Sequence, residues 1–178
     1  MNAGAVATRY AKAIYEYALG KGDEDVVYEG FGLFAENFFR LPELGKALKD
    51  PTISAEQKLE VLLTACGNTE NETLRKVIQL VLKNGRMDYM ENIALVYEEQ
   101  YRKSKGIVIA YLTSVEPANE KAKKELINVI SKITQSQVEF HNQTNPDIIG
   151  GFILEIENNR LDASVSDQLN RLKLEMIS

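Results

Sequence analysis

The chain has 178 residues, 44% of them hydrophobic, which is enough apolar material for a buried core in one domain or two small ones. Its formal net charge of −5, from 21 basic and 26 acidic residues, gives no electrostatic support for nucleic-acid binding, which depends on neutralising phosphates. No apolar run approaches the roughly 20 residues that span a bilayer, and no signal-peptide pattern opens the chain, so we expect a cytosolic protein that reaches a membrane only through a partner.

The first part of the chain, up to about Gly106, predicts six helices separated by turn signals. The first helix covers about residues 5–19 and ends at Gly20-Lys21-Gly22, because glycine is favoured just after a helix. Asp23 is a candidate N-cap for the second helix, which ends before Pro42.

Four shorter helices follow in the same segment. One covers about residues 43–49, and the next begins with Ser54 and Gln57 at the spacing of a capping box. Short connections between such helices imply a compact bundle. Apolar residues at helical spacing mark four of the six helices: Val27, Phe31, Phe34 and Phe38; Leu59, Leu62, Leu63 and Cys66; Leu74, Val77, Ile78 and Val81; and Met90, Ile93, Ala94, Tyr97 and Tyr101.

The pattern changes after Gly106, where residues 107–113 form a run rich in β-branched and aromatic side chains. We therefore predict a mainly α protein, with an N-terminal six-helix bundle over residues 1–105 and a small α+β domain over residues 106–178. In the second domain we expect a helix from Pro117 to about Ile133, strands at 138–142, 148–157 and 160–163, and a last helix capped by Ser164 or Ser166. On the helix we expect one apolar face with Ala122, Leu126, Val129, Ile130 and Ile133.

No set of residues has the pattern of a catalytic or cofactor site. Residues 30–35 match the loose dinucleotide pattern G-x-G-x-x-A, but they fall inside a predicted helix, so we interpret the glycines as helix-packing positions. Gly150-Gly151 has no following Lys-Ser or Lys-Thr and indicates a bulge or a close backbone approach. His141 has no second His or Cys nearby, and Cys66 is interpreted as a buried structural thiol. We expect no catalytic residue, no metal and no cofactor.

The first predicted helix carries more apolar surface than one buried face needs. Leu80 similarly lies off the main apolar stripe of the fifth helix. Either both helices are buried on all sides, or they leave an exposed apolar groove, and the pattern alone does not choose between these. On the first helix, Val6, Tyr10, Ala13, Ile14 and Tyr17 form one stripe, which Ala7, Ala11, Ala18 and Leu19 extend around the helix.

Four separated segments carry motifs that can be compared with a known family. These are Ala7-Thr8-Arg9-Tyr10-Ala11-Lys12-Ala13, Leu82-Lys83-Asn84-Gly85-Arg86-Met87, Asn145-Pro146-Asp147-Ile148-Ile149-Gly150-Gly151-Phe152 and Asp162-Ala163-Ser164. They are similar, in this order, to the family patterns A-R-x-Y-A-K-A, x-x-N-G-R-L, D-P-x-L-I-G-G and D-x-S, with Thr8 and Met87 as mild departures. Together they resemble the delta subunit of bacterial F-type ATP synthases, whose mitochondrial counterpart is the oligomycin-sensitivity conferring protein.

The resemblance implies a non-catalytic subunit of the peripheral stalk, which links the catalytic head to the b-subunit stalk as part of the stator for proton-driven ATP synthesis. It implies that the first domain binds the N-terminal helix of an alpha subunit in a groove between the first and fifth helices, and that the second domain contacts the b subunits. The groove carries over onto Tyr10, Ala13 and Leu80, and helical spacing adds Tyr17 and Val77.

The complex would hold the chain peripherally at the cytoplasmic face of the bacterial cell membrane, and we expect the isolated protein to be a monomer. Two other interpretations remain open from the sequence. One is a free-standing helical adaptor that binds an amphipathic peptide. The other is an enzyme whose site is assembled from scattered residues.

Overall fold

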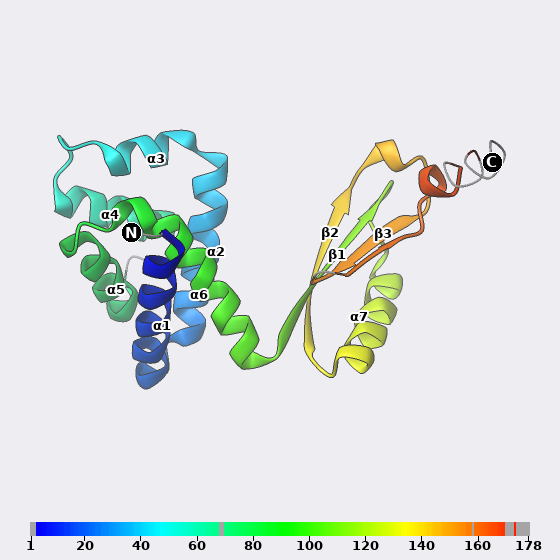
Figure 1. Cartoon of the computed structure of the whole chain (residues 1–178), viewed down its shortest axis with the longest axis horizontal. Coiled ribbons are helices and arrows are strands. Elements are labelled where there is room, and N and C mark those ends of the chain that lie inside the picture. Colours follow the sequence, from blue (N-terminus) through cyan, green and yellow to red (C-terminus); the bar gives the residue numbers. More distant parts are fainter. Residues whose placement is uncertain (1–2, 68–69, 158, 170–172, 174–178) are drawn as a thin grey trace. The chain divides into compact units, whose positions relative to one another are not determined.

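The computed structural model describes residues 3–67, 70–157, 159–169 and 173. The chain divides into two compact units, Met1–Arg102 and Lys103–Ser178 (Figure 1). The first unit is helical and the second contains a small sheet, which confirms the predicted mainly α fold with an α+β C-terminal part.

The first unit is built from helices joined by short turns. Its described helices are α1 (Ala3–Lys21), α2 (Glu24–Arg40), α3 (Pro42–Lys49), α4 (Ala55–Ala65), α5 (Glu72–Lys83), the 3-10 helix η1 (Met87–Tyr89) and α6 (Met90–Lys105), whose end from Lys103 on is counted with the second unit. The sequence predicts each of these α-helices to within a few residues, because their boundaries depend on local turn and capping signals.

The helix starts show which local signals the chain uses. Ser54 and Gln57 form both halves of the predicted capping box at the start of α4, with N···O distances of 3.0 and 3.2 Å. Asp23 occupies the N-cap position of α2 but makes no capping hydrogen bond. Its carboxylate accepts a hydrogen bond from the Thr73 hydroxyl instead, so Asp23 connects two helices rather than capping one.

The core of the first unit contains the apolar stripes that the sequence predicts. Every member of the four stripes is buried except Phe38, which is half-buried. The ring of Tyr97 is completely buried and packs at 5.1 Å from that of Phe31, while its hydroxyl donates to the Glu24 carbonyl at 3.1 Å. Gly30 lies inside α2, where an added Cβ would stand 3.1 Å from a Leu74 methyl group, so this glycine serves helix packing rather than a dinucleotide turn.

The second unit is a four-stranded sheet with a helix on one face (Figure 1). Its described elements are β1 (Ile107–Ser114), α7 (Glu120–Thr134), β2 (Gln137–Thr144), the 3-10 helix η2 (Pro146–Ile148), β3 (Phe152–Ile156) and β4 (Asn159–Asp162). The strand order is β2-β1-β3-β4; β1 and β2 are parallel, and the other neighbours are antiparallel. Ala110, Leu112, Ile130 and Leu154 form the buried centre between the sheet and α7.

Three elements or faces of the second unit are smaller than the sequence predicts. Helix α7 begins at Glu120 rather than Pro117, because Asn119 caps it by accepting from the Ala122 amide at 2.8 Å. Its predicted apolar face is narrower, since Ile133 is 77% exposed and Val129 53% exposed. The predicted strand at 148–157 is shortened to β3, because η2 and a turn precede it.

Gly151 forms the turn before β3 and makes the close backbone approach that the sequence predicts. Its φ is +77°, and an added Cβ would lie 2.3 Å from the Ala163 carbonyl oxygen. Ser164 caps the helical residues 165–169, because its hydroxyl accepts from the Asp167 amide at 3.2 Å. Ser166 therefore does not have the capping role that the sequence left open.

Candidate partner-binding groove

Helices α1 and α5 lie against each other in opposite directions. The Thr73 hydroxyl at the start of α5 is hydrogen-bonded to Asp23, just beyond the end of α1. The Lys76 ammonium group lowers the pKa of Glu72 through a hydrogen bond and its charge, and Lys21 at the end of α1 lowers it further. These contacts place the end of α1 beside the start of α5, so the two helices are antiparallel.

A groove of about 280 Å³ lies between these two helices. Ile14 and Val77 form its floor and are almost fully buried. Tyr17 and Leu80 are 38% and 45% exposed, so apolar side chains remain open to solvent on both sides of the groove. Its lining consists of Ala13, Ile14 and Tyr17 from α1 and Lys76, Val77 and Leu80 from α5.

The geometry decides between the two arrangements that the apolar pattern left open. Ala7, Ala11 and Ala18 are completely buried, whereas Ala13 is exposed, so α1 has one covered face and one open face. The same holds for α5, whose Leu80 lies outside the buried stripe. The apolar surplus of these helices is therefore an open groove in the chain by itself.

Four of the five residues assigned to the groove from the sequence line it in the structure: Ala13, Tyr17, Val77 and Leu80. Tyr10 is half-buried on α1 and is not among the lining residues. Ile14 and Lys76 line the groove although the sequence assigned them no role there. Ile14 belonged to the apolar stripe, and Lys76 stands four residues before Leu80, which is the spacing of one helix face.

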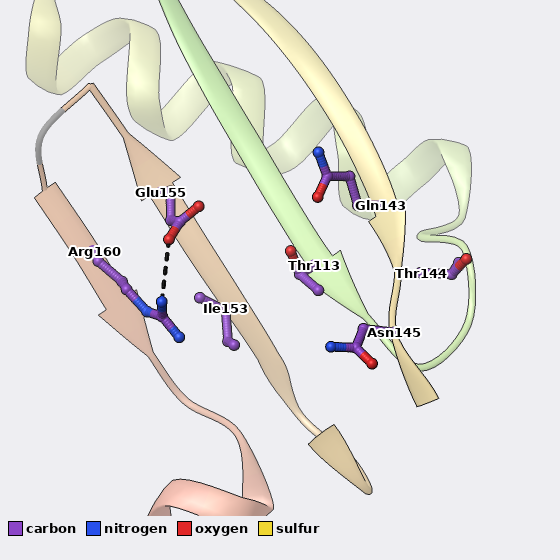
Figure 2. A pocket seen from close by; sticks show the side chains of 7 residues that line it. All are labelled: Thr113, Gln143, Thr144, Asn145, Ile153, Glu155 and Arg160. Carbon is purple, nitrogen blue, oxygen red and sulfur yellow. Dashed lines mark ion pairs between the residues drawn. The ribbon is translucent and has the colours of Figure 1, made fainter. Parts of the chain in front are cut away.

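A second cleft, of about 400 Å³, lies on the sheet of the second unit (Figure 2). Thr113 and Ile153 are opposite each other in the register of β1 and β3. They alternate with Leu112 and Leu154, which pack with Ile130 of α7, so the cleft is on the face away from α7. Its lining is mostly polar and comes from every strand: Thr113, Gln143, Thr144, Asn145, Ile153, Glu155 and Arg160.

Arg160 is held in this second cleft by two carboxylates. Its guanidinium lies 3.4 Å from the Glu155 carboxylate, as Figure 2 shows, and 3.2 Å from that of Asp162. The Ser164 hydroxyl and amide donate to Asp162, and these hydrogen bonds lower the pKa of Asp162, with a smaller contribution from Arg160. An arginine already paired in this way has a structural role and offers no proton for acid or base chemistry.

Neither His141 nor Cys66 has the surroundings of a catalytic residue. His141 is exposed, stacks on the Tyr111 ring at 5.1 Å and lies 3.0 Å from the Glu139 carboxylate. Burial raises the pKa of the Cys66 thiol to about 12, which leaves too little thiolate for a nucleophile near neutral pH. In the part of the chain that the structure describes, no group of three or more His, Cys, Asp or Glu side chains has the arrangement of a metal site.

The described structure is that of a binding protein. It consists of a helical bundle with an open apolar groove, followed by a small sheet domain whose polar cleft is lined in part by an ion pair. A family model described as "ATP synthase delta (OSCP) subunit" matches residues 6–176. The chain belongs to this family. The motif-based recognition from the sequence is thereby confirmed.

Relatives with the same description cover essentially the whole chain. An ATP synthase subunit delta from Azobacteroides pseudotrichonymphae genomovar CFP2 is 50% identical over 177 residues, which is 99% of this chain and 100% of the relative. An ATP synthase subunit delta from Phocaeicola vulgatus is 38% identical over 179 residues, which is 100% of this chain and 97% of the relative. A chain in the cryo-EM structure of the Toxoplasma gondii mitochondrial ATP synthase hexamer has a TM-score of 0.69 at 19% identity, with 97% of each chain covered, and shows the same fold.

Membership of this family fixes the class of function. The chain is a non-catalytic subunit of ATP synthase and a component of its peripheral stalk, so the interpretations as a free-standing adaptor or as an enzyme are not favoured. The complex as a whole is membrane-associated. Among the described residues of this chain, no helix has the length and apolar character needed to cross a membrane.

Proposed function

We propose that the chain joins the catalytic head of ATP synthase to the b-subunit stalk. In this proposal the domain of residues 1–105 binds the N-terminal helix of an alpha subunit, and the domain of residues 106–178 contacts the b subunits. The complex then holds the chain at the cytoplasmic face of the bacterial cell membrane. The protein is a monomer when isolated, since its groove is used for a partner of different sequence.

The observation that carries this proposal is the open groove between α1 and α5. Its two rows of side chains, Ala13 and Tyr17 on one helix and Val77 and Leu80 on the other, run antiparallel and leave apolar surface uncovered. Such a groove suits the apolar face of an amphipathic helix, whose anchors recur every three to four residues. The small side chain of Ala13 lets the backbone of that helix approach α1 closely.

The proposal predicts that a carboxylate in the groove strongly weakens binding without unfolding the domain. Ala13→Asp places a charge against the apolar face of the docked helix, where it finds no partner and costs about 2–4 kcal/mol. The affinity should fall by roughly 30- to 1000-fold. Folding should change little, because Ala13 is exposed in the free chain. Leu80→Asp should behave in the same way, since Leu80 is 45% exposed.

The measurement is isothermal titration of each variant with a synthetic peptide of the alpha-subunit N-terminal helix, together with a thermal melt. Val27→Asp is the control for lost folding, because Val27 is completely buried in α2 and an unpaired charge there should unfold the bundle. If Ala13→Asp and Leu80→Asp bind the peptide as wild type does, or melt as early as Val27→Asp, the groove is not the binding site.

A further inference from the structure

The two ends of the groove differ in charge. At the Tyr17 end, Lys76 is 2.5 Å from Glu72, and Glu16, which precedes Tyr17, is paired with Lys12 at 3.9 Å. The Glu72 carboxylate also raises the pKa of Lys76 through their hydrogen bond. This end is therefore close to electrically balanced.

The opposite end carries positive charge that no acidic side chain of α1 or α5 offsets. Because α1 and α5 are antiparallel, Arg9 stands one helical turn beyond Ala13, and Lys83 stands one turn beyond Leu80, at the same end of the groove. Both side chains are exposed, and within the described residues neither is ion-paired with a carboxylate. We call this end, defined by Arg9 and Lys83, the basic end.

The sequence around the basic end contains no acidic residue on either helix. Helix α1 has no Asp or Glu before Glu16, and α5 has none after Glu72. Helices α2 to α7 each have an acidic residue in the first turn, whereas α1 has none to offset its positive N-terminus. Lys83 offsets the negative C-terminus of α5, and Arg9 has no such partner. Near the basic end the two groove helices therefore contribute only basic charged side chains, in a chain whose net charge is −5.

We propose that the helix docked in the groove carries carboxylate side chains, and that Arg9 and Lys83 bind them at the basic end. This inference rests on the proposed function, because it concerns the same groove and the same alpha-subunit helix. The apolar side chains of the groove do not distinguish the two directions in which an amphipathic helix can lie. A charge at one end does, so the basic end sets the direction of the docked helix.

The test is to reverse each charge in the full-length chain and titrate it with the alpha-subunit N-terminal peptide at low and high salt. Arg9→Glu and Lys83→Glu should each weaken binding by roughly 3- to 10-fold at about 50 mM salt, and by less at about 500 mM, because exposed charges are screened. Lys46→Glu is the matched control: it makes the same charge change at an exposed position on α3, which contributes nothing to the groove. It should change affinity by less than about twofold.

A charge exchange tests the direct contact. A peptide whose acidic residues are replaced by lysine should bind wild type more weakly and bind the double variant Arg9→Glu/Lys83→Glu better than it binds wild type. The proposal is overturned if the single variants bind like Lys46→Glu, or if the exchanged peptide shows no preference for the double variant. Should Ala13→Asp abolish binding while these charge variants have no effect, the groove stands and only the charge inference falls. A wild-type chain that binds no peptide removes both.

Discussion

Gly151 offers the sharpest test of what stabilises the second unit, because a side chain there would cause both backbone strain and a steric overlap. Its backbone has φ of +77°, a conformation that a residue with a side chain adopts at a cost of about 1–2 kcal/mol. A methyl group there would also lie 2.3 Å from the Ala163 carbonyl oxygen and 3.0 Å from the Ser164 Cα. Both are backbone atoms, so a side-chain rotation cannot relieve the overlap.

The free-energy cost of Gly151→Ala depends on which backbone segment the new methyl group displaces. Shifting residues 163–164 disturbs the hydrogen bond from the Ala163 amide to the Phe152 carbonyl and that from the Val165 amide to the Gly150 carbonyl, each 2.9 Å long. At about 1 kcal/mol for each bond, together with the backbone strain, Gly151→Ala should cost the second unit about 3–4 kcal/mol. A small domain has a free energy of unfolding of only about 5 kcal/mol, so this change removes most of it.

Gly106→Ala is the matched control in the same unit. Gly106 has φ of +63°, but an added Cβ would meet nothing within 4 Å, so the substitution carries the backbone strain alone. Urea titrations of the ¹⁵N-labelled full-length chain, followed through amide signals of β1 and β3, measure the stability of the second unit, and signals of α4 and α6 report on the first. Gly151→Ala should be less stable than Gly106→Ala by about 2 kcal/mol, with the first unit unchanged. Equal losses in the two variants would show that the contact between Gly151 and Ala163 does not constrain the unit.

Two further predictions concern titratable groups. The Cys66 thiol, buried and with its pKa raised to about 12, should react with an alkylating reagent at pH 8 at least about 100-fold more slowly in the folded chain than in urea; similar rates would mean that the end of α4 is open. The pKa of Asp162 is lowered from its ordinary 3.8, first by the Ser164 hydroxyl and amide, so its carboxylate stabilises the second unit above that pH and less as pH falls through the folded value. Asp162→Asn should therefore destabilise the unit at pH 6, and this difference should shrink as pH falls below 3.8. A pH-independent difference in urea midpoint would contradict the assignment.

The helices of the first unit could be predicted because their signals are local. Ser54 and Gln57 are three residues apart, and the buried stripe of α6 repeats every three to four residues, so neither depends on distant parts of the chain. Asp23 occupies the predicted N-cap position, but its side chain does not cap α2, because its hydrogen-bond partner, Thr73, lies fifty residues further on. No pattern within α2 indicates that contact.

The second unit was harder because its limits depend on tertiary pairing. The apolar run from Ile148 favours a long strand, yet pairing with β1 begins only at Phe152, which lies opposite Ser114. Similarly, Val129 and Ile130 are adjacent β-branched residues of α7, but only Ile130 meets the buried centre of the sheet. A helix that covers one face of a small sheet buries a narrow stripe, and the sequence does not show how narrow.

The groove shows the same limit. Ala11 and Ala13 are identical residues two positions apart on α1, yet Ala11 is completely buried and Ala13 is exposed. Apolar periodicity identified the surplus on α1 and α5, but which face stays open depends on how neighbouring helices pack. Lys76 was missed for another reason: a lysine in an apolar groove has no hydrophobic signal, although its aliphatic stem can line such a surface.

The family motifs themselves divide into residues that build the fold and residues that remain available to a partner. The G-G and D-x-S motifs meet in space: Gly151 leaves room for Ala163, and Asp162 accepts from both the amide and the hydroxyl of Ser164, at 3.1 and 2.6 Å. Their spacing is explained by closure of the chain after β4, without any ligand. The opening motif is different, because its Ala11 is buried while Arg9 and Ala13 are exposed beside the groove. Substitutions in the G-G and D-x-S motifs should therefore act on stability, whereas our proposal predicts that substitutions of Arg9 and Ala13 change binding while the fold persists.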